Sequence, residues 1–270
     1  MNTLEMEMIE TLKRLKNNFG VFEIKAEYEN EGSRLVELMR LKDVTSFVGI
    51  PLIIKIGGVE AVSNIYDALT IGVKGIVAPM AETAFATSKF LDAIDTFVAK
   101  DNQEDIEFAV NIETITAFHN FDEILNLKKI GLLSSITIGR VDFTGSLYKD
   151  RSFANSDAMY LYCKTICEKT KKKGLKTALG GAISLESKDF IKNLIDENLL
   201  DKYETRKIVY ASSGIKTIKE GLLEGIKFEL QWLKSKRRYY HRITVEDEKR
   251  IQISWCGGDV KDDERISHDY

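Results

Sequence analysis

Two acidic residues each follow an apolar, strand-like run. Glu113 ends such a run in "FAVNIETITAF" (108–118), and Asp142 follows another in "SSITIGRVDFTGS" (134–146). Mg²⁺ and Mn²⁺ prefer oxygen ligands and are often held by one or two carboxylates, with water and substrate oxygens in the remaining positions. The pair therefore predicts a divalent metal site on Glu113 and Asp142. Taken singly, each acid is also typical of a helix or turn N-terminus, where negative charge is favoured.

Two cations stand at comparable positions. Lys55 interrupts "PLIIKIGG" beside two glycines, so its ammonium can approach a carboxylate or a phosphate without steric obstruction. Arg140, in "IGRVD", has a guanidinium that can bind a substrate carboxylate in a bidentate manner. Structural ion pairs are the alternatives: Lys55 with Glu82 or Glu27, and Arg140 with a neighbouring acid.

Two further acids are candidates for a catalytic base. Glu27 and Glu29 follow the first strand-like segment, in "KAEYENEG". A glutamate can act as a base near neutral pH if burial or neighbouring acids raise its pKa. Otherwise both are solvated turn acids.

Strand-like segments alternate with helical patterns along the chain, which predicts parallel strands with right-handed crossovers. The strands are expected at 20–29, 51–58, 75–82, 106–113, 134–142, 176–184 and 206–212, with helices between them at 33–44, 60–72, 84–100, 116–129, 156–174 and 188–203. Seven strands are one short of a TIM (β/α)8 barrel, and an open doubly wound sheet is the alternative. The missing strand is absent, degenerate or contained in "SFVG" (46–49).

The barrel is favoured because polar residues gather at the predicted C-terminal strand ends, where a barrel builds its active site. No G-x-G-x-x-G motif of a dinucleotide fold follows the first strand. The 270 residues, 44% of them hydrophobic, suit one barrel domain over 1–240, and 241–270 reads as a charged extension. A long amphipathic helix is expected from residue 215 to the end of this domain, in a pattern that continues to residue 243.

Composition limits the partners. The net charge is −3 with both signs mixed, which favours neither nucleic acid nor an anionic membrane as a partner. The N-terminal segment reads as an amphipathic helix rather than a signal peptide, and no apolar run is long enough to span a membrane. We expect a cytoplasmic protein that acts on a small molecule.

Four segments together resemble the HpcH/HpaI aldolase and citrate lyase β-subunit family of the phosphoenolpyruvate/pyruvate barrels. They are "KIGGVEA", "GVKGIVAPMAET", "VNIETITAFHNFDEIL" and "ITIGRVDFTGSL", within a resemblance that covers about residues 20 to 185. The resemblance implies that Glu113 and Asp142 bind the metal, and that a 2-oxo acid binds this metal as its enolate forms. It also implies that backbone N–H groups around Gly139, Val141 and Asp142 hold the substrate carboxylate.

The sequence departs from the family pattern at two places. Lys55 replaces an arginine that contacts substrate, and the segment carrying Glu27 and Glu29 lacks the histidine base of the family's aldolases. We expect substrate contacts from Lys55, Glu82, Gly139, Arg140, Val141 and Gly181, and catalytic roles for Lys55, Arg140, Glu27 and Glu29. The paired glycines of "ALGGAIS", which include Gly181, are typical of close backbone packing against a ligand or the barrel wall.

Two functions of different class follow. The first is a metal-dependent carbon–carbon lyase or aldolase acting on a 2-oxo acid or acyl substrate. The second is a non-catalytic anion-binding or assembly subunit that keeps the metal ligands and lacks the base. Phosphoryl or acyl transfer on the same barrel is a third option. The resemblance further implies a homo-oligomer in which the last helix packs on a neighbouring subunit; packing on its own barrel is the alternative.

Overall fold

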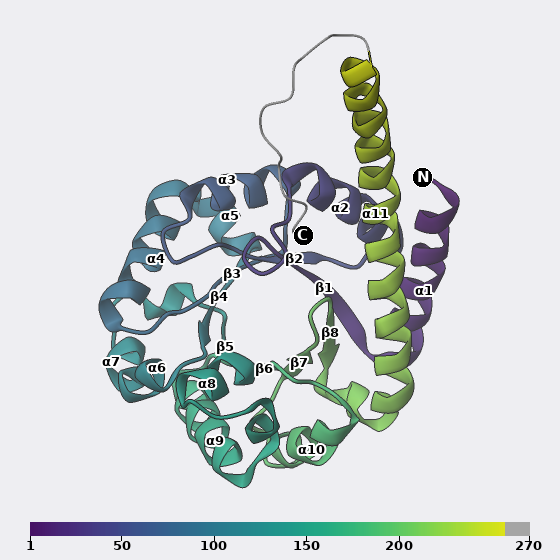
Figure 1. Cartoon of the computed structure of the whole chain (residues 1–270). Coiled ribbons are helices and arrows are strands. Elements are labelled where there is room, and N and C mark those ends of the chain that lie inside the picture. Colours follow the sequence, from purple (N-terminus) through teal and green to yellow (C-terminus); the bar gives the residue numbers. More distant parts are fainter. Residues whose placement is uncertain (257–270) are drawn as a thin grey trace.

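Eight strands form a closed barrel with helices around it in the computed structural model, which describes residues 1–256 (Figure 1). The strands, in chain order and in order around the barrel, are β1 (Val21–Glu27), β2 (Leu52–Lys55), β3 (Gly75–Ala78), β4 (Glu107–Ile112), β5 (Ser135–Gly139), β6 (Lys176–Gly180), β7 (Lys202–Glu204) and β8 (Ile208–Ala211). All seven predicted strand segments contain one of them. The predicted α/β barrel class is confirmed.

Amphipathic helices cover the outside of the barrel, and the first three of them end at a glycine. Gly20, Gly49 and Gly72 have φ near +65 to +69° and stop three helices just before a strand begins. The helices are α1 (Thr3–Phe19), α2 (Leu35–Val48), α3 (Val62–Ile71), α4 (Ala84–Phe97), α5 (Lys100–Asp105), α6 (Ile115–His119), α7 (Phe121–Leu125), α8 (Arg140–Ser146), α9 (Asp157–Lys172), α10 (Lys188–Asp196) and α11 (Ile218–Cys256). Short 3₁₀ turns are η1 (Ile130–Leu132), η2 (Arg151–Asn155), η3 (Leu185–Ser187) and η4 (Ser212–Thr217).

The barrel closes through a hairpin. Neighbouring strands from β1 to β7 are parallel, but β7 and β8 pair antiparallel, and β8 pairs antiparallel with β1. The proposal that "SFVG" (46–49) contains the eighth strand is wrong, because residues 46–48 end α2 and Gly49 caps it. The additional strand is β7, at the end of the segment 188–203 that was predicted to be helical.

Charged side chains fill the barrel interior beside this hairpin. Alternate residues of a strand face opposite sides, and on β1 Ile24 and Ala26 lie in the core under the helices while Lys25 and Glu27 line the inside. Three ion pairs join β1 and the loop after it to the hairpin strands and their turn: Lys25 with Glu204 at 2.6 Å, Lys202 with Glu23 at 2.9 Å, and Lys207 of the turn with Glu31. Ion pairs therefore cross the seam at which the barrel closes.

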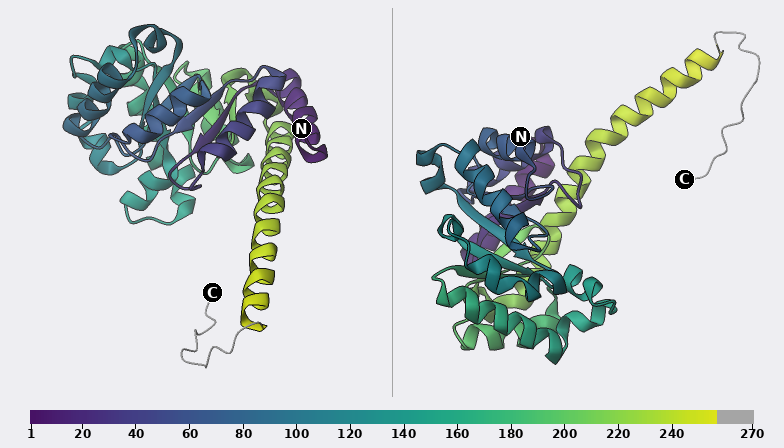
Figure 2. Two further views of the ribbon diagram at one scale, coloured as in Figure 1. Left: turned by 90° about the horizontal axis from the view of Figure 1, so that it is seen from above. Right: turned by 90° about the vertical axis from the view of Figure 1, so that its left-hand side faces the viewer.

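The C-terminal helix α11 begins against β8 and then leaves the barrel. The Tyr210 hydroxyl donates a hydrogen bond of 2.9 Å to the Gly221 carbonyl, and Leu222, Phe228 and Trp232 are buried. The first part thus packs on its own barrel, beside α1, and the second part extends beyond it (Figure 2). The helix runs past residue 240, the predicted domain boundary, and residues 257–270 of the predicted extension lie outside the described residues. None of the helices within residues 1–256 is long and apolar enough to cross a membrane.

Candidate active site

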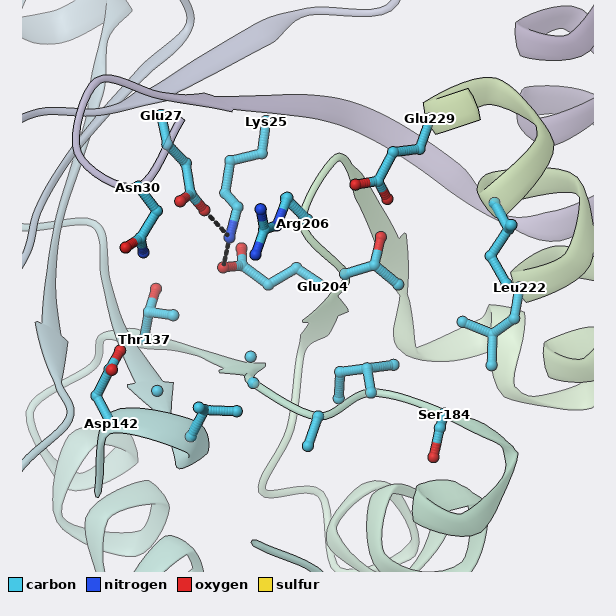
Figure 3. A pocket seen from close by; sticks show the side chains of 18 of the residues that line it. Lys25, Glu27, Asn30, Thr137, Asp142, Ser184, Glu204, Arg206, Leu222 and Glu229 are labelled. Atoms are coloured by element: carbon cyan, nitrogen blue, oxygen red, sulfur yellow. Dashed lines mark hydrogen bonds and ion pairs between the residues drawn. The ribbon is translucent and has the colours of Figure 1, made fainter. Parts of the chain in front are cut away.

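A cavity of about 960 Å³ opens at the C-terminal ends of the parallel strands. In a barrel of this kind these ends carry the active site. Figure 3 shows residues of β1, β5, β7, the loop after β6 and α11 around one space. Its polar lining includes Lys25, Glu27, Lys55, Asn111, Glu113, Thr137, Asp142, Arg151, Ser184, Glu204 and Arg206.

Glu113, directly after β4, is buried and held by two donors. Its Oε1 accepts a hydrogen bond from the Met80 N–H at 2.9 Å, and its Oε2 accepts one from Asn111 Nδ2 at 3.0 Å. Met80 has φ of +52°, a strained conformation for this residue, which aims its N–H at the carboxylate. Burial raises the pKa of Glu113 and the charge of Asp142 adds to this, against the opposing effects of Lys55 and the two donors. The carboxylate is therefore fixed in place and gains from a nearby positive charge.

Asp142 lies in the first turn of α8, after β5, and is exposed to the cavity. Strands β4 and β5 are adjacent and parallel, with Ile112 paired to Ile138, so Glu113 and Asp142 meet at the same rim. Both acids line the same cavity. That they bind a metal ion stays a prediction.

The residues at this rim fit a hard divalent cation. Asn111 Oδ1 is buried without a hydrogen-bond partner, 5% of the residue being exposed, and it belongs to the amide that holds Glu113. Gly139 leaves the room for the carboxylate, since a Cβ there would lie 2.5 Å from Glu113 Oε2. Two carboxylates and a spare amide oxygen are the donors such an ion takes, with water and substrate completing the shell. In the described part of the chain no group of three or more His, Cys, Asp or Glu side chains is placed to hold a metal ion.

Lys55, at the end of β2, lies in the same cavity. Its ammonium contacts Glu29 Oε2 at 2.7 Å, so the ion-pair partner is neither Glu82 nor Glu27, the two that the sequence offered. Burial alone would lower the pKa of Lys55, but Glu113, Glu29 and Glu27 outweigh it and raise the pKa. Lys55 is therefore a cation at neutral pH, which suits it to attract an anion rather than to act as a nucleophile.

Glu27 is also in the cavity, as the partner of a buried lysine. Lys25 Nζ lies 3.2 Å from Glu27 Oε1 and 2.6 Å from Glu204 Oε1, and Figure 3 shows it between the two carboxylates. Burial would raise the pKa of Glu27, but Lys25, Lys55 and Lys207 together lower it. A raised pKa was the condition for Glu27 to serve as the base, and the structure has the opposite shift.

Arg140 requires a correction. Its guanidinium is fully buried outside the cavity lining, and it donates to the carbonyls of Ala154 at 2.9 Å and Gly181 at 2.7 Å and to Asn155 Oδ1 at 2.8 Å. It also lies over the Phe190 ring, 4.7 Å from its centroid. Burial lowers the pKa of Arg140 to about 10. The side chain therefore joins η2 to the loop after β6, and neither the predicted substrate clamp nor an acid partner is observed.

Glu82 and Glu29 are likewise not among the cavity-lining residues. Glu82 accepts a hydrogen bond of 2.8 Å from the Thr114 hydroxyl, which occupies it at the outer rim. Gly139, Val141 and Gly181 do line the cavity. Gly181, at φ of +74°, is needed because a Cβ would lie 2.7 Å from the Val141 nitrogen. The close approach of the loop after β6 to the start of α8 leaves the first-turn N–H groups of α8 beside the cavity.

Sequence reasoning missed several cavity residues. Lys25 was missed because it was read as part of an ordinary strand. Glu204 was missed because β7, the strand that contains it, was not predicted. Asn111 and Thr137 face inward on β4 and β5, and their signal was available: a polar residue two positions before a strand-end site residue lies on the same face. Arg206, in the turn between β7 and β8, had no such signal.

No family model matches the sequence, and no curated protein does either. Solved structures do. An HpcH/HpaI aldolase from Desulfitobacterium hafniense DCB-2 is 13% identical, with a TM-score of 0.58 over 73% of this chain and 81% of that one. The citrate synthase SbnG is 16% identical, with a TM-score of 0.59 over 74% and 81%. A citrate lyase beta subunit from M. tuberculosis, complexed with oxaloacetate and magnesium, is 11% identical, with a TM-score of 0.50 over 79% and 92%. At these identities the likeness establishes the fold: this chain has the barrel fold of the HpcH/HpaI aldolases and citrate lyase β-subunits, as the sequence motifs predicted.

Proposed function

We propose that this protein is a divalent-metal-dependent lyase or aldolase that makes or breaks a carbon–carbon bond next to a 2-oxo acid. The observation that carries the proposal is the meeting of Glu113 and Asp142 in one cavity, with the unpartnered Asn111 Oδ1 beside them. The structural neighbour complexed with magnesium and oxaloacetate, a 2-oxo acid, supports the same chemistry.

Glu113, Asp142 and Asn111 would hold Mg²⁺ or Mn²⁺. Such an ion, when bound, polarises the 2-oxo group and stabilises negative charge on its oxygen. Lys55 supplies a second, fixed positive charge for the substrate carboxylate, and the first-turn N–H groups of α8 add donors. Gly139 and Gly181 keep space for these groups. These interactions grow stronger as negative charge develops, which is the condition for lowering a barrier.

The first test is calorimetric titration of chelator-stripped protein with Mn²⁺, with and without oxalate. We expect Mn²⁺ binding that oxalate tightens. Glu113→Gln should abolish the binding and keep the fold, because the new amide oxygen can still accept from Met80 N–H and a flipped Asn111 can accept from the new amide nitrogen through its free Oδ1.

The matched control is Glu82→Gln, a strand-end acid held outside the cavity by Thr114. It should leave Mn²⁺ binding unchanged. Binding that survives Glu113→Gln, or that Glu82→Gln removes equally, would contradict the site.

A non-catalytic anion-binding or assembly subunit is the second candidate. It is favoured by the lowered pKa of Glu27 and by a cavity lining that contains no histidine within the described residues. The two candidates differ in proton transfer, since enolate formation removes a C3 proton of pyruvate. Mn²⁺-loaded enzyme in D₂O should exchange the pyruvate methyl protons, followed by NMR. Tight oxalate binding without exchange would identify the non-catalytic subunit.

A further inference from the structure

A second cavity, of about 300 Å³, lies outside the barrel between α2 and α11. The described residues that line it all belong to these two helices, which run beside each other in Figure 1. Within residues 1–256, no residue lines both this cavity, which we call the α2–α11 pocket, and the cavity at the strand ends. Its volume is at the lower end of the range for ligand pockets. The pocket is therefore a separate site with room for a small molecule.

Apolar side chains form much of the wall of the α2–α11 pocket. Val36 and Met39 of α2 are 58% and 49% exposed, so water contacts a large part of their surface. Trp232 of α11 is buried and lines the pocket as well. An apolar ligand would remove the exposed surface of the α2 side chains from water, and an aromatic ring suits contacts with an indole and a thioether. The wall therefore favours a ligand with an apolar body.

The indole of Trp232 also carries an unused hydrogen-bond donor. Its Nε1 is buried, with 4% of the residue exposed, and no acceptor within residues 1–256 pairs with it. A buried indole N–H usually has a partner, because an unpaired donor loses the hydrogen bond that water gave it. An acceptor on a ligand in the pocket would satisfy this donor.

Lys236, one turn further along α11, supplies a positive charge at the same place. Its ammonium lies 5.7 Å from the centroid of the Trp232 ring, and no acidic side chain within the described residues forms an ion pair with it. Burial lowers the pKa of Lys207 against the effect of Glu31, and the charge of Lys236 lowers it further. Lys236 thus lies near another cation and has no counterion, so an anion beside it would be favoured.

The acids of the pocket do not meet this need. Glu37 accepts a hydrogen bond from the Tyr240 hydroxyl, and Asp43 is exposed, so that water screens its charge. Arg40, the other cation of the lining, already pairs with an acid of α1. An indole N–H and an ammonium are left as donors. A carboxylate accepts through two oxygens and can satisfy both of them.

We propose that the α2–α11 pocket binds a small monocarboxylate with an apolar body, whose oxygens accept from Trp232 Nε1 and Lys236 Nζ. The bound molecule would contact both helices at once. It would thus fasten α11 to the barrel near the point where this helix leaves it (Figure 2). The site is independent of the proposed function, because the described residues that line the two cavities are different.

A small ligand is favoured over a second copy of the chain because the exposed apolar stripe of α11 lies outside the pocket. Leu230 and Leu233 are 50% and 48% exposed, and neither lines the pocket. A subunit that packed on this stripe would not bring an acceptor to Trp232 Nε1. A ligand inside the pocket would.

Binding is measured on the metal-free chain with phenylacetate and cyclohexylacetate. Calorimetric titration gives the affinities, and the indole N–H signal of Trp232 in ¹H–¹⁵N NMR spectra reports on the donor itself. The chain has two tryptophans, so the signal that disappears in Trp232→Phe belongs to Trp232. We expect saturable binding of both acids. Cyclohexylacetate, which has no ring current, should move the signal downfield as a new hydrogen bond forms, and an unmoved signal would overturn the proposal.

Two further compounds separate the parts of the ligand. Acetate has the carboxylate without the apolar body, and 2-phenylacetamide has the body without the charge. Each should bind at least about tenfold more weakly than phenylacetate. If the amide bound as tightly as phenylacetate, an anion would not be what the pocket recognises. If acetate did, the apolar wall would contribute nothing, and the proposal would fail in either case.

Matched variants of α11 locate the ligand. Lys236→Gln and Trp232→Phe each remove one donor and should weaken phenylacetate binding about tenfold. Trp232→Phe keeps an aromatic ring and breaks no hydrogen bond, and Lys236→Gln tests the site separately should that variant not fold. Lys234→Gln removes a charge that is exposed on the same helix outside the pocket, and it should leave the affinity unchanged. Equal weakening by Lys234→Gln and Lys236→Gln would contradict the proposed contact.

Two measurements test for other places and other occupants. Phenylacetate should bind equally well with saturating Mn²⁺ and oxalate present, whereas displacement would place it in the cavity at the strand ends. Met39→Asp should sediment with the mass of the wild type, whereas a lower mass would show that a second copy covers the pocket. Either contrary result would reject the site. Failure of oxalate-dependent Mn²⁺ binding would instead reject the proposed function and leave this site in place.

Discussion

The barrel wall from β2 to β6 and the part formed by β7, β8 and β1 are held together in different ways. In the first, parallel strands are joined through helices, and their outer faces are buried by isoleucine, valine and phenylalanine. In the second, antiparallel pairing closes the barrel, and the ion pairs Lys25–Glu204, Lys202–Glu23 and Lys207–Glu31 cross the seam. The parallel strands need only an apolar outer face to pack under their helices. The β7–β8 hairpin has no helix between its strands, and its pairing with β1 is specified by the charged side chains that face into the barrel.

Of the substitutions that test this difference, removal of the Lys25 charge should lower the free energy of unfolding most. Lys25→Met keeps most of the side-chain volume but leaves Glu27 and Glu204 buried without their counterion. Breaking a buried ion pair from one side costs about 3–5 kcal/mol of the free energy of unfolding. Urea unfolding at pH 7 measures it, and the loss should shrink as the pH is lowered, because the two carboxyls then take up protons.

The double variant Lys25→Met/Glu204→Gln is the control for the charge. It should recover part of the stability lost in Lys25→Met, because one of the two unpaired carboxylates is removed. Equal stability of the single variant and the wild type would mean that the seam does not depend on its ion pairs.

The same contrast explains how far the sequence could predict this fold. The βα pattern from residue 50 to 200 produced strands at the correct places because β-branched runs bounded by turns are reliable where helices bury the outer face of the strand. The run Glu23, Lys25, Glu27 alternates with apolar residues in a pattern that usually marks a solvent-facing edge. Here the charged face is the barrel interior, which only the partners Glu204 and Lys202 make possible, and these lie about 180 residues away in the chain.

Strand β7 could not be recognised for a related reason. Three residues, "KYE", carry no periodicity of their own, and only residues 197–201 separate them from the amphipathic helix α10, so the helical pattern was extended over them. The meeting of Glu113 and Asp142 in one cavity was predictable because each acid follows a strand on adjacent βα units. The direction of Arg140 was not, because one residue at a strand-to-helix junction can point into the site or into the wall.

An apolar substitution in the parallel part gives the reference for the seam. Ile138 on β5 is fully buried, and Ile138→Ala should cost about 2–5 kcal/mol through lost burial and the cavity left behind. Unlike the loss in Lys25→Met, this cost should be the same at pH 7 and pH 5, as measured by urea unfolding. If the cost fell equally with pH in Ile138→Ala and Lys25→Met, the two parts of the wall would not differ in how they are held together.

Arg140 is a buried cation of the parallel part, and its partners are carbonyl and amide oxygens in place of carboxylates. Arg140→Gln should cost about 1.5–3 kcal/mol, the range for hydrogen bonds to a charged group. Arg140→Lys, which keeps the charge, should recover less than half of it because an ammonium cannot reach Ala154 and Gly181 together. Hydrogen exchange should speed up in residues 151–155 and 180–184 in both variants, and unchanged exchange there would show that Arg140 does not tie these segments together.

Glu27→Gln should have the smallest effect on the free energy of unfolding. The pH dependence of that effect tests the ion pairs at the seam. Lys25 keeps Glu204 as a partner, so the loss at pH 7 should be about 1 kcal/mol, as for a hydrogen bond to a charged group that is partly replaced. Because the pKa of Glu27 is lowered in the folded protein, the unfolded chain binds its proton first as the pH falls. The stabilisation by Glu27 is therefore complete above the ordinary value of 4.5 and is lost as the pH falls through the lower folded pKa. The wild type should lose more stability than Glu27→Gln between pH 5 and pH 3, whereas parallel curves would show that this carboxylate titrates alike in the folded and unfolded states.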